Sequence, residues 1–136
     1  MDVEEATVRA FMLRDRRDRW IASLSTARRR RKATDRLAHL RDLDPRYAHR
    51  LEPSGQQSSV ILDELRRRGA PATCHVISEN TSLDARDLPL EDILDEVVGS
   101  MHGTIVICVA GELAYYEGED QGERYILERP GGAGRY

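Results

Sequence analysis

The segment "SENTSLDARDLP" (residues 78–89) carries an oxygen-rich group of side chains directly after a strand-like stretch. Loops at strand ends are where binding groups concentrate, and carboxylates are preferred ligands of Mg²⁺ and Ca²⁺. Glu79, Asp84 and Asp87, close in sequence to Ser78, are therefore candidate metal ligands, and such a site would suit a metal-dependent hydrolase or nuclease. The spacing matches no EF-hand, and the alternative is that Asp84 or Asp87 caps a turn or the helix that follows.

A second candidate site is the run of five consecutive cations within "STARRRRKATDRLAHL". The candidate residues for binding an acidic partner or another anion are Arg28, Arg29, Arg30, Arg31 and Lys32. A helix turns by about 100° per residue, so five successive side chains cannot all face one surface. The run therefore divides between different faces of its helix.

Arg30 is the unusual member of this run, because it continues an apolar stripe formed by Ala33, Leu37 and Leu40. An arginine in such a position reaches solvent with its tip, binds an external anion, or pairs with a carboxylate inside the protein. The second half of the chain offers many carboxylates. We therefore expect Arg30 to make ordered carboxylate contacts, and Arg28 and Lys32 to stay mainly in solvent.

The remaining reactive residue types form no familiar catalytic pattern. The four histidines are dispersed, and HExxH, GxSxG, GxGxxG and P-loop patterns are absent, so no catalytic residue and no cofactor is predicted. Cys74 and Cys108 lie in the apolar stretches "TCHVIS" and "TIVICVA" without CxxC spacing. Both are expected to be buried, reduced thiols.

Charge is distributed unevenly along the 136 residues. Residues 1–70 carry a formal charge of +6 and residues 71–136 carry −9, which gives the net charge of −3. This polarity favours attraction between the two halves, or between one copy and the next, so a homo-oligomer is one expected assembly.

Hydrophobic spacing predicts the elements that position these side chains. The first half follows helical spacing, and its clearest helix is "SGQQSSVILDELRRRGAP", with Ser54 and Gln57 as a capping box and Gly69 at the end. After Pro71 the pattern predicts a strand at 72–78, a helix at 88–101 and strands at 103–109, 112–118 and 123–129. Short glycine-bearing connections between the last three favour an antiparallel meander.

These elements predict an α+β fold. A helical N-terminal half would pack on one face of a mostly antiparallel sheet of about four strands, with a β-α-β-β-β C-terminal half. Residues 1–129 would form a single domain and residues 130–136 a flexible glycine-rich tail. Of the adjacent Tyr115 and Tyr116, one would pack inside and the other would be exposed for contacts. We expect one core to contain Leu37, Leu40, Leu62, Leu65, Ile105, Ile107 and Ile126.

Composition narrows the class of protein. The longest apolar run is far shorter than the roughly 20 residues of a membrane helix, and the acidic N-terminus is unlike a secretory leader, so a cytoplasmic protein without membrane contact is expected. The single Phe and single Trp give little support to nucleic-acid recognition. The leading hypothesis is a small interaction or regulatory protein whose arginine-rich helices engage an acidic protein surface or a nucleic acid. The alternative is the metal-dependent hydrolase.

Overall fold

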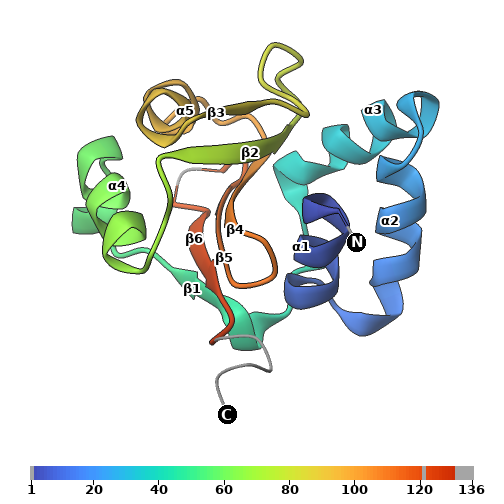
Figure 1. Ribbon diagram of the computed structural model, residues 1–136, viewed down its shortest axis with the longest axis horizontal. Coiled ribbons are helices and arrows are strands. Elements are labelled where there is room, and N and C mark those ends of the chain that lie inside the picture. The colour runs from blue at the N-terminus through green and yellow to red at the C-terminus, as the bar shows by residue number, and fades with distance from the viewer. Residues whose placement is uncertain (1, 121, 131–136) are drawn as a thin grey trace.

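The computed structural model describes residues 2–120 and 122–130, and it confirms the α+β class. Helices precede most of the strands along the chain (Figure 1). The α-helices are α1 (Val3–Phe11), α2 (Arg17–Leu24), α3 (Ala27–Asp35), α4 (Ser58–Arg67) and α5 (Leu90–Val97), with 3₁₀ turns η1 (Arg14–Arg16), η2 (Arg36–His39), η3 (Pro45–Tyr47) and η4 (Pro53–Gly55). The strands are β1 (Ala48–Arg50), β2 (Thr73–Ser78), β3 (Asp87–Pro89), β4 (Thr104–Val109), β5 (Leu113–Glu117) and β6 (Arg124–Glu128).

The strands form one antiparallel sheet in the order β1-β6-β5-β4-β2-β3. It therefore has six strands rather than the expected four or so. The two additional strands, β1 and β3, have three residues each and lie at the two edges. Strands this short carry too few residues for an alternating pattern to be detected.

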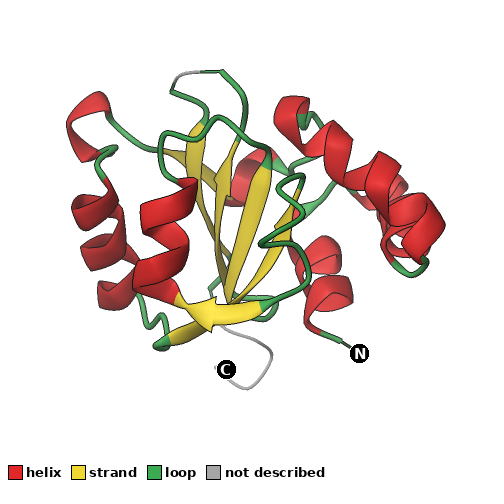
Figure 2. Ribbon diagram, turned by 90° about the horizontal axis from the view of Figure 1, so that it is seen from above, coloured by secondary structure: helices red, strands yellow, loops and turns green. Residues whose placement is uncertain are grey.

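Helices cover both faces of the sheet, so the expectation of one covered face is wrong. Figure 2 shows the strands as a central layer, with α4 and α5 on one side and the N-terminal helices on the other. The reason lies in the strands, whose central members are apolar at successive positions. All residues of β5 and the first five of β4 are buried, which requires a covering layer on each face.

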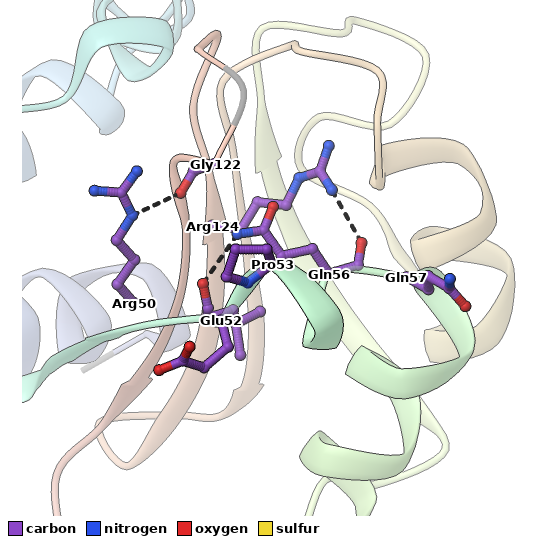
Figure 3. Close-up of a pocket in the computed structure, with 8 residues that line it drawn as sticks. Arg50, Glu52, Pro53, Gln56, Gln57, Gly122 and Arg124 are labelled. Atoms are coloured by element: carbon purple, nitrogen blue, oxygen red, sulfur yellow. Dashed lines mark hydrogen bonds between the residues drawn. The ribbon is translucent and has the colours of Figure 1, made fainter.

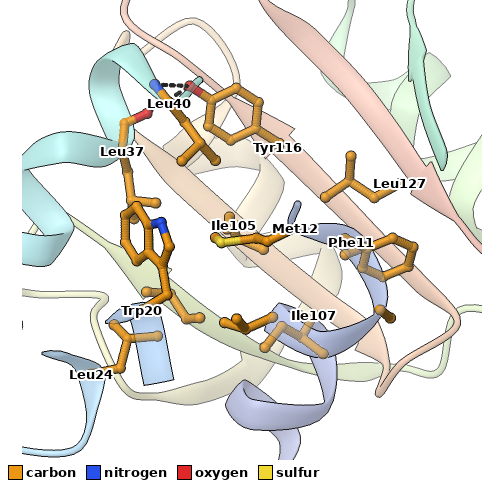
Figure 4. Close-up of a cluster of buried hydrophobic side chains, with 14 of the residues drawn as sticks. Phe11, Met12, Trp20, Leu24, Leu37, Leu40, Ile105, Ile107, Tyr116 and Leu127 are labelled. Atoms are coloured by element: carbon orange, nitrogen blue, oxygen red, sulfur yellow. Dashed lines mark hydrogen bonds between the residues drawn. The ribbon is translucent and has the colours of Figure 1, made fainter. Parts of the chain in front are cut away.

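The hydrophobic interior is accordingly divided into two clusters, one on each face. The first cluster lies between the sheet and α1, α2, α3 and η2, and it includes Phe11, Met12, Trp20, Leu24 and Ile105 (Figure 4). The second cluster lies between the sheet and the helices α4 and α5. The expectation of one core is wrong, because Leu37, Leu40, Ile105 and Ile107 belong to the first cluster, whereas Leu62, Leu65 and Ile126 belong to the second.

Tyr115 and Tyr116 face opposite sides of β5, and both are buried, at 0% and 1% exposure. The expectation that one of them is exposed is therefore wrong. Each hydroxyl has an internal partner. Tyr116 donates to the carbonyl of Leu37 at 2.6 Å, and Tyr115 donates to Glu117 at 2.8 Å. These bonds satisfy the polar end of each ring within its hydrophobic cluster.

Two local details decide how the helices connect to the sheet. The helix α4 begins after Gln57 without a side-chain cap, so the capping box predicted from Ser54 and Gln57 is wrong, whereas Gly69 does follow its end, with φ of +107°. Gly103 is needed for a close approach. A Cβ atom there would lie 2.2 Å from the backbone nitrogen of Ala38 and 2.3 Å from the carbonyl carbon of Leu37. The predicted tail from residue 130 falls almost wholly outside the described residues.

Candidate functional site

Arg30 lies at the centre of a charged network that joins α1, α3 and the loop after β2. Its guanidinium donates to Glu4 through Nη1 at 2.7 Å and Nη2 at 2.8 Å, and to Asp84 through Nε at 2.7 Å and Nη2 at 3.0 Å. The three side chains are only 14–17% exposed. The prediction that Arg30 makes ordered carboxylate contacts is confirmed, and its anchors are bidentate pairs, the strongest form of such bonds.

His75 on β2 extends the network to the edge of the sheet. Its Nε2 lies 2.7 Å from Glu4 Oε2 and its Nδ1 lies 2.6 Å from Asp87 Oδ1. Two carboxylate neighbours both require a ring N–H, so this geometry suits the protonated imidazolium. The hydrogen bond to Glu4 raises the pKa of His75 despite its burial, and the bond to Asp87 adds to the rise.

The pKa of Glu4 reflects the charged groups around it in this network. Burial by itself raises the pKa of Glu4, but the hydrogen bonds from His75 and Arg30 outweigh burial and lower that pKa to about 2. The hydrogen bonds from Glu4 and Asp84 likewise raise the pKa of Arg30 above its ordinary value. The charged forms of Glu4, His75 and Arg30 are therefore stabilised by one another.

The three carboxylates proposed as metal ligands have separate partners. Glu79 accepts a hydrogen bond from the backbone N–H of Gly103 at 2.7 Å, and Asp84 accepts from the N–H of Ser78 at 2.9 Å as well as from Arg30. Asp87 lies on β3 beside His75. Within residues 2–120 and 122–130, no group of three His, Cys, Asp or Glu side chains is placed to hold a metal ion. The hydrolase alternative thus gains no site from the fold and stays a prediction.

The other members of the cationic run face away from this network. Arg28, Arg29, Arg31 and Lys32 are exposed, as predicted for Arg28 and Lys32. Arg31 forms a loose pair with Asp35 at 3.7 Å. Arg28, Arg29 and Lys32 form no ion pair with any residue that the structure describes.

A shallow groove of about 450 Å³ runs between α2 and α3, and we call it the α2–α3 groove. Its lining residues are Ser23, Arg29, Lys32, Ala33, Asp35 and Arg36. Positions 29, 32 and 36 recur on one side of the helical turn, so three cations line one groove. Arg36 was not recognised from the sequence, because its role depends on packing: its guanidinium lies 4.9 Å from the ring of Trp20.

Trp20 is itself a buried residue, at 2% exposure, and its indole N–H donates to Asp42 at 2.8 Å. Its ring is covered on one face by Arg36 and lies among apolar residues of the first cluster. The one tryptophan of the chain is therefore part of the scaffold under the groove. It offers no open ring face for a stacked base.

A second cavity, of about 670 Å³, lies between β6 and the segment that links β1 to α4 (Figure 3). Arg50 donates to the carbonyl of Gly122 at 3.0 Å, and Arg124 donates to the carbonyl of Gln56 at 2.9 Å. Figure 3 shows the two guanidinium groups pointing in different directions from the cavity wall. They fasten loops rather than converge on one ligand position.

Beside this cavity, Arg124 also lies 3.4 Å from Glu117, which is only 1% exposed. Burial raises the pKa of Glu117, although hydrogen bonds from Tyr115 and from the backbone N–H groups of Met101 and Gly99 oppose the rise. Glu117 was not recognised from the sequence. Its carboxylate secures the turn between α5 and β4.

No protein-family model matches the chain, and neither a curated protein nor a solved structure is significantly similar to it. None of the described helices combines the length and apolar character needed to cross a membrane. Any functional conclusion therefore depends on the geometry above.

Proposed function

We propose that this chain is an interaction protein whose α2–α3 groove binds an acidic segment of a partner protein. The observation that carries the proposal is the division of the cationic run. Arg30 is used inside the fold, whereas Arg29 and Lys32, with Arg36, line a groove and have no carboxylate partner among the described residues. Exposed arginines keep their planar hydrogen-bonding groups available for carboxylates.

An acidic protein segment suits this groove better than a nucleic acid does. Single-stranded nucleic acids bind through aromatic side chains that stack on bases, and Trp20 is buried beneath Arg36. Duplex binding depends on many phosphate contacts, and the chain as a whole carries a net charge of −3. A few aligned cations match a short run of carboxylates. We propose that this interaction takes place in the cytosol.

The partner could also be a second copy of the chain. The helix α5 exposes Glu91, Asp92, Asp95 and Glu96 on the opposite side of the molecule from α3 (Figures 1 and 2). Attraction between α5 of one copy and the groove of the next would join copies head to tail, and such contacts do not close into a symmetric dimer. Sedimentation of the protein alone at low salt therefore belongs in the test.

The experiment compares two double charge reversals that change the net charge equally. Arg29→Glu with Lys32→Glu alters the groove, and Arg66→Glu with Arg67→Glu alters exposed positions on α4, at the other side of the sheet. Binding of a fluorescein-labelled oligoglutamate peptide, and of single-stranded and duplex DNA and RNA, would be measured by anisotropy at several salt concentrations.

The expected result is oligoglutamate binding that the groove reversal reduces at least about tenfold, roughly 1.4 kcal/mol, and that the α4 reversal changes little. Equal losses in both variants would show a response to net charge alone and would contradict the proposal. Preferential binding of DNA or RNA, with a salt dependence that weakens by about one unit for each cation removed, would assign the groove to nucleic acid instead.

A further inference from the structure

The two cysteines of the chain face each other across neighbouring strands. β2 and β4 pair antiparallel, with His75 opposite Ile107 and Val76 opposite Val106. Extending this register by one residue brings Cys74 opposite Cys108, which lies where the pairing of β4 with β5 shifts its register. Both side chains point to the same face of the sheet, because both belong to the second cluster, beneath α4 and α5.

The hydrogen-bond pattern identifies the kind of pair that they form. The N–H of Val76 donates to Arg86 and its carbonyl accepts from Ala85, so the backbone polar groups of Val76 point toward the β3 side and away from β4. The backbone N–H and C=O groups of successive residues point to alternate sides of a strand. Cys74 lies two residues before Val76, so its backbone groups also point toward β3, and it occupies a non-hydrogen-bonded position relative to β4. The Cα atoms of such pairs lie about 4.5 Å apart. Disulfides span Cα separations of about 4.4–6.8 Å.

The Sγ of Cys74 donates to the carbonyl of Pro71 at 3.7 Å, and the Sγ of Cys108 donates to the carbonyl of Val106 at 4.0 Å. The neighbouring thiol of Cys108 lowers the pKa of Cys74 against the effect of burial, and the thiol of Cys74, together with burial, raises the pKa of Cys108. Cys74 is thus the thiol of the two that ionises first. The thiolate is the form that attacks an oxidant, so Cys74 has the character of the attacking residue and Cys108 that of its resolving partner.

We propose that Cys74 and Cys108 form a redox-responsive dithiol that hydrogen peroxide converts into a cross-strand disulfide. The Cys74 thiolate attacks one peroxide oxygen, which breaks the O–O bond and forms a sulfenic acid while the second oxygen leaves as hydroxide. Cys108 sulfur then attacks the Cys74 sulfur, and the sulfenic oxygen leaves as water. In total, two thiols lose two protons and two electrons, and one peroxide becomes two waters.

The burial of the two thiols predicts what limits the rate of this reaction. Cys74 is 3% exposed and Cys108 is 7% exposed, and Leu62 and Leu65 of α4 belong to the same cluster. Peroxide is small, yet it must still enter the cluster beneath α4 and α5, so the rate should follow local opening of these helices. Once formed, the disulfide would join adjacent strands at a Cα separation near the short end of the range that disulfides span.

The test treats the native full-length chain with hydrogen peroxide, then unfolds it in N-ethylmaleimide and measures the intact mass. The expected product is a monomer lighter by two hydrogens, without maleimide adducts, and dithiothreitol should restore two reactive thiols. Cys108→Ser, or Cys108→Ala if serine impairs folding, should instead stop at a sulfenic acid on Cys74 that dimedone traps. Cys74→Ala should give neither product.

Two results would overturn the proposal. The first is recovery of both thiols as maleimide adducts after peroxide has modified the methionines, because this would show that oxidant reached the protein and left the pair untouched. The second is a disulfide found only between two chains, which would show that the cysteines react through other surfaces. Circular dichroism of each variant at the start would establish that it is folded.

Discussion

Replacing Arg30 with alanine should destabilise the protein far more than replacing Arg28, although both arginines belong to one run. Arg30→Ala removes the guanidinium that Glu4 and Asp84 share, and these carboxylates have only 14% and 17% side-chain exposure. Arg28 is exposed and forms no ion pair with a described residue. Its replacement should change stability by less than about 0.5 kcal/mol, which is usual for surface positions.

The magnitude for Arg30 follows from the network. Removing one partner of a buried ion pair costs about 3–5 kcal/mol. This range needs a reduction here, because His75 still donates to Glu4 and the N–H of Ser78 still donates to Asp84. As a check, a fall in the pKa of Glu4 from 4.5 to about 2 corresponds to about 3 kcal/mol, a contribution that Arg30 and His75 share. We therefore expect Arg30→Ala to cost about 2–4 kcal/mol.

Urea denaturation at neutral pH measures this difference, and its pH dependence tests the cause. The pKa of Glu4 is lowered in the folded state, so its contribution is present above pH 4.5 and is lost as the pH falls toward 2. The gap between wild type and Arg30→Ala should narrow over that range. Equal losses for the two arginine variants, or a gap that stays constant with pH, would refute the argument that Arg30 acts by pairing with these carboxylates.

Three further predictions concern other parts of the fold. His75 has a raised pKa, so its stabilising contribution is present below about pH 6.5 and is lost as the pH rises through its folded value; urea melts of His75→Gln should differ from wild type more at pH 6 than at pH 9. Leu65→Ala, at a fully buried position, should cost about 2–5 kcal/mol in the same assay and should accelerate maleimide labelling of native Cys74, whereas a loss below about 0.5 kcal/mol would contradict the packing of α4. Gly103→Ala should lower the free energy of unfolding by about 3 kcal/mol or more, because its Cβ would overlap the backbone at Leu37 and Ala38. Gly69→Ala should lower it less, because a Cβ there has no atom within 4 Å and only the positive φ opposes it. Similar shifts in melting temperature for the two variants would contradict a steric cause.

The sequence was informative wherever one local rule decided the structure. Helical spacing located α4, and short strand-like apolar stretches located β2, β4, β5 and β6. The position of Arg30 on an apolar stripe indicated a carboxylate partner before any partner could be named. In these cases the spacing of the apolar residues and the chemistry of the side chains indicate the same local structure.

The parts that could not be predicted depend on distant segments meeting. The partners of Arg30 are 26 residues earlier and 54 residues later in the chain, and no local pattern selects Glu4 or Asp84 from the other carboxylates. The prediction of a single hydrophobic core failed for a related reason. Ile105 and Val106 are both apolar, and their separation onto two faces follows from the pleat only once it is known that helices cover both.

The order of the strands in the sheet also determines when each part of the fold can form during synthesis. α1, α2 and α3 leave the ribosome before β4, β5 and β6, yet the first cluster needs Ile105, Tyr116 and Leu127 from those strands. Among the strands that the structure describes, β1 pairs only with β6, which comes after all the others in the sequence. Contacts between distant segments close slowly, since the loop entropy is lost before the contact forms. The apolar faces of the N-terminal helices therefore stay uncovered, and accessible to chaperones, until the C-terminal strands have been synthesised.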